Sequence, residues 1–333
     1  MTWSIFKKDY KELNHSDYLN LNTKQIIVKY FLIKIMKYVH IGLGKNGTSF
    51  LQNEVFPKIS NLLNIKYYNK DINHDFLSLD NYFVSFEDLV GEFFSPTTWE
   101  ESLKINIEKF GRDANIIITI RNPIDYFTSM FCQSYHSFQI GPEEEFFLDN
   151  VSSKKNLENK KYYFINYENF SYERLINLYT KEFKNVYIIK YEDNKNLEIW
   201  SKVFKNENIN KLNINKKFKN RSYSHYGMTL TFKLNKFLKI FNSNLYNFQM
   251  SINKISEFKL FPKKIRDKLR YELNWRFFIQ YRFDKFFSYK KYKIQNSSIK
   301  KHIIQNNEGY YKKLNSFHYF NNVPKEIKTN SVS

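Results

Sequence analysis

Hydrophobic residues form short runs separated by helical stretches from residue 37 onward. Ile116–Ile120 (IIITI) and Val186–Lys190 (VYIIK) are β-branched and unbroken, a pattern typical of strands buried on both faces of a sheet. Lys37–Leu43 and Tyr82–Phe86 are predicted as two further strands. Strands that alternate with helices predict an α/β fold with a central parallel sheet covered by helices on both sides.

The helical stretches lie between these strands. They are predicted over Thr48–Leu63, Thr98–Phe110, the residues after Ile120, and Glu168–Phe183. Gly111 is expected to end the second helix as a C-cap. Beyond about residue 195 the pattern becomes mostly helical and more basic, which predicts a helical C-terminal extension.

The pattern divides the chain into three parts. Residues 1–35 show no clean periodicity and are interpreted as a variable leader. Residues 36–320 are predicted to form one α/β domain, with a nucleotide-binding core at 37–225 and a helical basic part at 226–320. The Asn- and Lys-rich residues 321–333 are expected to be a flexible tail.

Composition adds a basic surface to this picture. The chain of 333 residues has 53 Lys and Arg against 33 Asp and Glu, a formal net charge of +20. Its single Ala and its many Lys, Asn, Ile, Phe and Tyr residues are what an A/T-rich coding bias produces, so the charge fits either biased Lys usage or attraction to an anion. The single cysteine, Cys132, excludes a disulfide framework and a multi-cysteine zinc site.

Membrane and secretion signals are weak. The most apolar run, Ile26–Met36, is short and carries two lysines, whereas a spanning helix needs about 20 apolar residues. The first 25 residues lack the order of a secretory signal. We therefore expect a soluble, cytoplasmic protein with no transmembrane segment.

The first constellation with chemical meaning comes after the first predicted strand. Lys45-Asn46-Gly47-Thr48-Ser49 places a lysine, a glycine and two hydroxyls at the start of a helix, where free N–H groups and the helix dipole favour an anion. A Walker A loop, GxxxxGK[ST], places its lysine after the second glycine, whereas Lys45 precedes Gly47. The alternative is an ordinary connection between a strand and a helix.

The second constellation comes after the strand at 116–120. Arg121 stands at the carboxyl end of this strand, where open α/β sheets bind ligands. Asn122, Pro123 and Asp125 form a helix start, and Ser129 lies two turns further along. Arg121 and Ser129 together could hold a phosphate; alternatively Arg121 pairs with Asp125 and Ser129 only fills the helix.

Together these segments resemble the nucleotide-binding motifs of sulfotransferases that use 3′-phosphoadenosine 5′-phosphosulfate (PAPS). K-x-G-T after a first strand and R-N-P-x-D-x-x-x-S about 75 residues later are similar to the family's 5′-phosphosulfate and 3′-phosphate motifs. The family's loop usually reads P-K-[TS]-G-[TS], whereas this chain has Gly44 and Asn46 at the first and third positions. The resemblance implies a P-loop-like three-layer fold, PAPS as co-substrate, and no metal.

The resemblance also implies residue roles. Lys45 would stabilise charge on the leaving phosphate, while Asn46, Gly47, Thr48 and Ser49 hold the 5′-phosphate. Arg121 and Ser129 would fix the 3′-phosphate, with a second grip from Arg221 and Ser222 in a late basic loop before a helix that starts near His225. The acceptor is expected to be a hydroxyl or amine of a carbohydrate, because H-I-G-x-x-K is more similar to bacterial glycan-modifying sulfotransferases than to those acting on steroids and phenols.

The acceptor needs a general base. Glu87, just past the second core strand, is the best placed candidate, although it could instead be a first-turn acid of the following helix. His40 is a second candidate, and the alternative for it is a structural role in the core.

Two other functions remain open. A nucleotide or small-molecule kinase shares the predicted fold but requires a Mg²⁺-binding carboxylate at a strand end, where Tyr191-Glu192-Asp193 are the available residues. A non-enzymatic protein that binds nucleic acid or another polyanion would explain the +20 charge, but not the two phosphate-type junctions.

Overall fold

The computed structural model describes residues 35–69, 73–91, 98–136, 143–148, 152, 165–215, 223–241, scattered positions from 262 to 286, and 290–321. The chain divides between Met36 and Lys37 into two units, and the second unit contains the central sheet and its helices. The predicted leader and the tail beyond Asn321 lie outside the described residues.

A six-stranded sheet with the order β2-β3-β1-β4-β7-β8 forms the centre of the second unit. β1 and β7 each pair parallel with β4, and β2 pairs parallel with β3, while β8 runs antiparallel to β7. The strands are Met36–Ile41 (β1), Lys66–Tyr68 (β2), Asn81–Phe86 (β3), Asn115–Ile120 (β4), Asn185–Lys190 (β7) and Phe317–Asn321 (β8). A separate pair joins Phe147–Leu148 (β5) to Ile165–Asn166 (β6).

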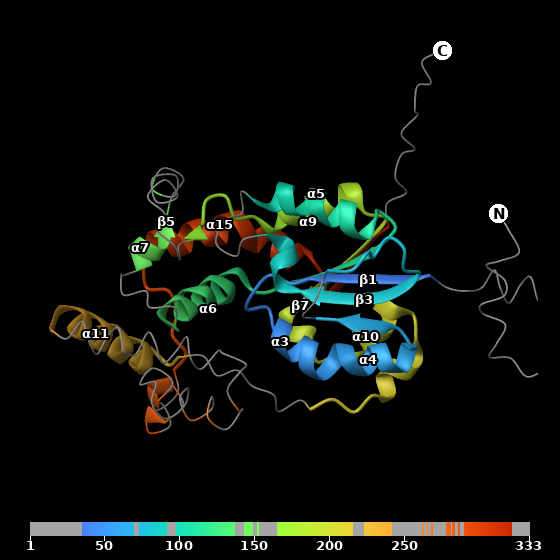
Figure 1. Cartoon of the computed structure of the whole chain (residues 1–333). Helices are drawn as coiled ribbons and strands as arrows, with labels where there is room; N and C mark the ends of the chain where they lie inside the picture. The colour runs from blue at the N-terminus through green and yellow to red at the C-terminus, as the bar shows by residue number, and fades with distance from the viewer. Residues whose placement is uncertain are drawn as a thin grey trace, which may run out of the picture. The chain divides into compact units, whose positions relative to one another are not determined.

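Helices cover both faces of this sheet, with α5, α9 and α15 on one side and α3, α4 and α10 on the other (Figure 1). The longer helices are Phe56–Leu63 (α4), Trp99–Phe110 (α5), Pro123–His136 (α6), Tyr172–Glu182 (α9), Leu197–Phe204 (α10), His225–Phe241 (α11) and Ser297–Lys313 (α15). The predicted α/β class with a mostly parallel central sheet is confirmed. None of the helices in the described part of the chain is long and apolar enough to cross a membrane.

The predicted helix over residues 48–63 forms in three consecutive pieces. Thr48–Phe50 (α3) leads into a π-helical stretch, Leu51–Val55 (η2), and then into α4. Pro57 near the start of α4 lacks an N–H group and cannot continue the α-helical bonding, which accounts for a wider turn just before it. Gly111 ends α5 with a positive φ of 75°, as the sequence predicts.

Aromatic rings fill much of the core on both faces of the sheet. On the face of α4 and α10, the rings of Phe56, Phe83 and Trp200 meet at centroid distances of 4.6–5.2 Å. On the opposite face, Tyr126 stacks on Phe170 with centroids 5.1 Å apart. Such packing fixes the strands that carry the site.

The C-terminal region corrects the prediction of a helical extension. After α15 the chain returns to the sheet as β8, which ends at Asn321, the first residue of the predicted tail. Tyr187 on β7 stacks on Phe317 and Tyr319 of β8, with centroids 6.1 and 4.8 Å apart. Rings occupy every position from Phe317 to Phe320, so the sequence shows no alternation that would mark this edge strand.

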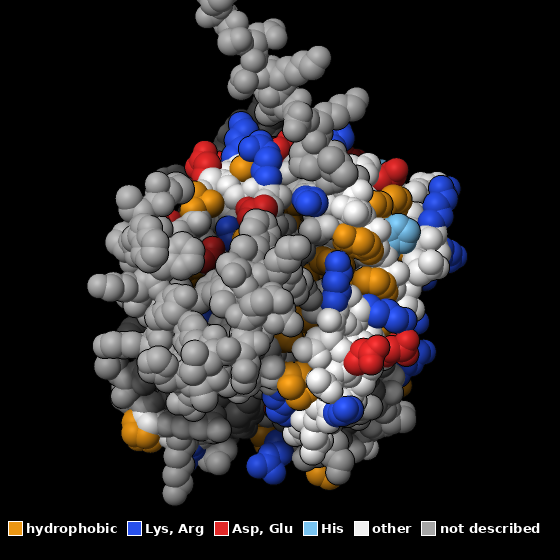
Figure 2. Space-filling view, turned by 90° about the vertical axis from the view of Figure 1, so that its right-hand side faces the viewer, with side chains coloured by type: hydrophobic (Ala, Val, Ile, Leu, Met, Phe, Trp, Pro, Cys, Tyr) orange, Lys and Arg blue, Asp and Glu red, His pale blue; other side chains and the backbone are white. Residues whose placement is uncertain are grey.

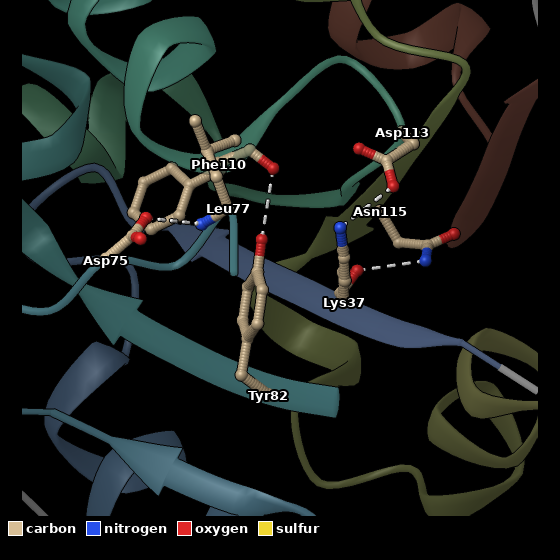
Figure 3. A network of polar contacts seen from close by, with 7 residues as sticks. All are labelled: Lys37, Asp75, Leu77, Tyr82, Phe110, Asp113 and Asn115. Atoms are coloured by element: carbon tan, nitrogen blue, oxygen red, sulfur yellow. Dashed lines mark hydrogen bonds and ion pairs between the residues drawn. The ribbon is translucent and has the colours of Figure 1, made fainter. Parts of the chain in front are cut away.

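Polar groups at the amino ends of the strands are paired with one another (Figure 3). Lys37 Nζ lies 3.1 Å from the Asp113 carboxylate, and Asn115 Nδ2 donates to the Lys37 carbonyl at 2.9 Å. The Tyr82 hydroxyl donates to the Phe110 carbonyl at 3.1 Å. This edge is therefore closed by its own hydrogen bonds.

Candidate functional site

The loop between β1 and α3 holds two residues with left-handed backbone, two positions apart. Lys45 has φ 65° and Gly47 has φ 82°. A Cβ on Gly47 would lie 2.7 Å from Asn194 Nδ2 and 2.9 Å from the Tyr191 ring, so both conformation and space require glycine there. Lys45 takes a backbone conformation that is uncommon and costly for a residue other than glycine.

Hydrogen bonds from two other strand ends hold this loop. Asn46 is fully buried, and its Nδ2 donates to the Thr119 carbonyl of β4 at 2.7 Å. Asn194 Nδ2 donates to the Asn46 carbonyl at 2.9 Å, and Trp200 Nε1 donates to the Asn194 carbonyl at 3.0 Å. The Asn46 side chain thus ties the loop to β4, whereas the sequence suggested that it donates to a phosphate.

The helix start beyond the loop offers backbone donors. Phe50 and Leu51 are the first residues whose N–H groups bond to a helical carbonyl, that of Gly47, at 2.9 and 3.1 Å. The N–H groups of Thr48 and Ser49 donate to no backbone carbonyl within the described part of the chain. Thr48 is buried together with its hydroxyl, whereas Ser49 is exposed.

Arg121 meets the loop directly. Its Nη1 donates to the Lys45 carbonyl at 3.0 Å, and its guanidinium lies 4.4 Å from the centre of the Tyr191 ring. The Tyr172 hydroxyl donates to the Arg121 carbonyl at 2.9 Å. Packing and backbone bonds therefore fix the arginine, and the two motifs that lie 76 residues apart in sequence are in contact.

The helix after Arg121 starts as the sequence predicts. Asn122 Oδ1 accepts the N–H of Asp125 at 3.3 Å, which makes Asn122 the N-cap of α6. Asp125 pairs with Lys291 at 2.7 Å, not with Arg121. This leaves the guanidinium available to the loop. Ser129 is half-buried on α6 and forms no hydrogen bond with Arg121.

Glu87 lies at the carboxyl end of β3, as the first residue of a short 3₁₀ helix, Glu87–Val90 (η3). Burial raises the pKa of its carboxyl, while the Lys45 ammonium and the Thr48 hydroxyl lower it. The Thr48 hydroxyl lies near the carboxyl without a hydrogen bond of ordinary geometry. Glu87 is thus both a first-turn acid and a neighbour of the Lys45 loop.

His40 is fully buried in β1, between its neighbouring strands. Nδ1 is 2.9 Å from Ser85 Oγ of β3, and Nε2 is 3.3 Å from Thr119 Oγ1 of β4. Burial lowers the pKa of His40 to about 3. A neutral ring with both nitrogens paired links three strands, which is the structural role that the sequence left open as an alternative.

Buried polar atoms without a hydrogen-bond partner cluster around the Lys45 loop, at the carboxyl ends of the strands. Nine such side-chain atoms occur in the described part of the chain, and five belong to the loop or to residues near it. They are Asn46 Oδ1, Thr48 Oγ1, Arg121 Nε, Tyr126 OH and Asn194 Oδ1. A buried polar atom left unpaired costs about 1–3 kcal/mol, so this clustering is typical of a site that binds something.

Three residues at this edge were not predicted from the sequence. Tyr191 and Asn194 come after β7, and Tyr172 begins α9. The parallel order of β1, β4 and β7 brings their carboxyl ends together, so the Tyr-Glu-Asp turn after β7 was the signal for Tyr191. Tyr172 is near Arg121 only through tertiary folding, and no local pattern indicates it.

Two predicted residues, Arg221 and Ser222, lie outside the described part of the chain. The helix predicted to come after them does begin at His225. Within the described residues, no group of three or more His, Cys, Asp or Glu side chains is placed to hold a metal ion.

No protein-family model, curated protein or solved structure matches this chain. The function is therefore inferred from the fold and the residues at the carboxyl edge of its sheet.

Proposed function

We propose that this protein is a P-loop-like sulfotransferase that moves a sulfuryl group from PAPS to a hydroxyl or amine of a carbohydrate. The observation that supports it best is the contact between Arg121 Nη1 and the Lys45 carbonyl, because it joins the two predicted phosphate motifs into one site. A double-headed ligand with a phosphate at each end needs such a pair of neighbouring basic groups.

The donor set fits an anion. Lys45 and Arg121 supply positive charge, and the N–H groups of Thr48 and Ser49 supply uncharged donors at a helix start. Arg121 Nε and Thr48 Oγ1 are buried and have no hydrogen-bond partner among the described residues. The acceptor oxygens at the edge, on Asn46 and Asn194, belong to amides that hold the loop through their nitrogens and are not needed for a phosphate.

In the proposed reaction the acceptor oxygen or nitrogen attacks sulfur in line with the leaving group. The bond from sulfur to the bridging phosphate oxygen breaks, and adenosine 3′,5′-bisphosphate leaves with the added negative charge, which Lys45 stabilises. The acceptor proton passes to the carboxylate of Glu87. Its raised pKa suits this role, because a more basic carboxylate is a better proton acceptor.

The acceptor class is proposed from the resemblance of H-I-G-x-x-K to the motif of glycan-modifying sulfotransferases. The cytoplasmic location is a separate proposal, which does not rest on this resemblance. A carbohydrate remains the proposed acceptor, and Glu87 remains the proposed base in preference to the buried His40.

Ligand-dependent thermal stability tests the proposal against its two rivals. The folded protein is heated with adenosine 3′,5′-bisphosphate, with ATP and Mg²⁺, or with duplex DNA at physiological salt. A ligand that binds only the folded state raises the melting temperature by mass action. We expect the bisphosphate to stabilise most; stabilisation by ATP and Mg²⁺ but not by the bisphosphate favours a kinase, and by DNA only favours a polyanion-binding protein.

The variant Arg121→Ala then locates the site. Loss of a charged hydrogen-bond donor is expected to weaken bisphosphate binding by about 1.5–3 kcal/mol, measured by calorimetric titration. Arg112→Ala is the matched control, because Arg112 pairs with Glu182 on an exposed surface. Equal binding by both variants would place the 3′-phosphate elsewhere.

A further inference from the structure

Helix α11 carries large hydrophobic side chains on its exposed face. Tyr226 and Phe237 are each 55% exposed, and Ile240 is 63% exposed. The helix lies beside α6, apart from the layers that cover the sheet (Figure 1). Half of the twelve exposed large hydrophobic side chains in the described residues lie between positions 226 and 286.

Lysines share this face with the hydrophobic side chains. Lys233 and Lys236 are exposed, and at 3.6 residues per turn they fall with Tyr226, Phe237 and Ile240 within about 100° of the helix circumference. We call these five residues the α11 face. It is a stripe of alternating hydrophobic and basic groups.

The opposite side of α11 packs against the protein. Gly227, Met228 and Thr231 are buried on that side. An ordinary amphipathic helix has a polar exposed side. The α11 face differs, because it is exposed and carries large hydrophobic side chains.

Helix α11 and the sequence that follows it are strongly basic. Helix α11 contains no Asp or Glu, and residues 225–300 contain 17 Lys and Arg against 4 Asp and Glu. Duplex nucleic acid would satisfy the lysines, but its stacked bases leave little apolar surface for Phe237 or Ile240. An anionic phospholipid surface satisfies both, because lysines meet the headgroup phosphates while the rings and aliphatic chains enter the interface.

We propose that the α11 face binds the surface of anionic membranes peripherally. Tyr226, Phe237 and Ile240 insert at the headgroup boundary, and Lys233 and Lys236 contact lipid phosphates. This inference does not depend on the sulfotransferase proposal, since no residue of the α11 face belongs to the Lys45 and Arg121 site.

Co-sedimentation of the full chain with lipid vesicles tests it. Vesicles of phosphatidylcholine with about 30% phosphatidylserine should bind the protein, and pure phosphatidylcholine should bind it much less. Replacing Phe237 and Ile240 together by serine should weaken binding about tenfold or more. Replacing Lys233 and Lys236 by glutamine should weaken it about fivefold for each lysine on the anionic vesicles.

Matched controls come from α5, where Lys104 and Ile105 are also exposed. Lys104→Gln and Ile105→Ser should bind vesicles as the unaltered protein does. The proposal is overturned if the unaltered protein ignores anionic vesicles, or if the serine variant binds them equally well. It is also overturned if the protein binds duplex DNA and only the lysine changes weaken DNA binding. A serine variant that loses thermal stability but no vesicle binding would overturn it too, because the chain would then cover the α11 face itself.

Discussion

The polar groups at the amino ends of the central strands are paired differently from those at the carboxyl ends. We call these two sides of the sheet the amino edge and the carboxyl edge. At the amino edge, Lys37, Asp113, Asn115 and Tyr82 are all paired, and the described side chains on this side of the molecule mix basic, acidic and hydrophobic types (Figures 2 and 3). At the carboxyl edge, Thr48 Oγ1, Arg121 Nε and other buried atoms have no hydrogen-bond partner within the part of the chain that the structure describes.

This difference separates stability from function within one sheet. Pairing a buried polar group stabilises the folded state. The amino edge therefore contributes stability, and its paired groups are not available to bind a ligand. The carboxyl edge carries unpaired groups and a left-handed Lys45, each of which costs folding free energy. A ligand that satisfies those groups would recover that cost as binding energy.

The largest expected effect comes from comparing Lys45, in the loop after β1, with Lys37, near the start of β1. Lys45→Ala should lower sulfuryl transfer by about 10²–10³-fold, because a charge that stabilises the leaving phosphate is removed, while bisphosphate binding largely persists. Rates with PAPS and a glycan acceptor, measured beside calorimetric titration of the bisphosphate, separate the two effects.

Lys37→Ala is the matched change at the other edge. It breaks the pair with Asp113 and should lower stability slightly, with transfer unchanged. Equal loss of transfer in both variants would mean that the two edges are not functionally distinct.

The sequence predicted those parts of the fold that depend on local pattern. The unbroken runs at 116–120 and 186–190 became central strands, the Asn122 cap starts α6, and Gly111 ends α5, because each signal acts within a few residues. Lys45, Arg121 and Glu87 could be placed near one another, since parallel strands end at one edge.

The remaining features depend on contacts that no local pattern contains. β2 has only three residues and β8 carries rings at four consecutive positions, so neither gives a clear period. The Tyr172 hydroxyl reaches Arg121 across 51 residues, and the Asn46 amide turns to β4 across 73. The side-chain partner of a buried amide is decided by tertiary packing, which is why Asn46 was interpreted as a phosphate ligand.

His40 provides a further test of this comparison, because it lies close to the carboxyl edge and both of its ring nitrogens have hydrogen-bond partners. Burial lowers its pKa to about 3, while the unfolded chain titrates near 6.5. Below about pH 6.5 the unfolded state binds a proton that the folded state does not, so this group makes stability fall with falling pH, by roughly 2 kcal/mol between pH 7 and pH 5.

The variant His40→Gln lacks this proton. It should be less stable than the unaltered protein at pH 7 but should lose less stability on going to pH 5, as measured by urea midpoints. Parallel pH profiles for the two proteins would mean that His40 is not held neutral.

The smallest expected effect compares one hydroxyl from each edge. Thr48→Val removes a buried hydroxyl that has no hydrogen bond of ordinary geometry among the described residues, so stability should change little, while bisphosphate binding weakens by about 1 kcal/mol. Tyr82→Phe removes a paired hydroxyl and should cost about 1 kcal/mol of stability with binding unchanged. Urea denaturation and calorimetric titration of both variants give the four values. If Thr48→Val proves the less stable of the two, the carboxyl edge is closed by bonds of its own and the contrast between the edges does not mark a binding site.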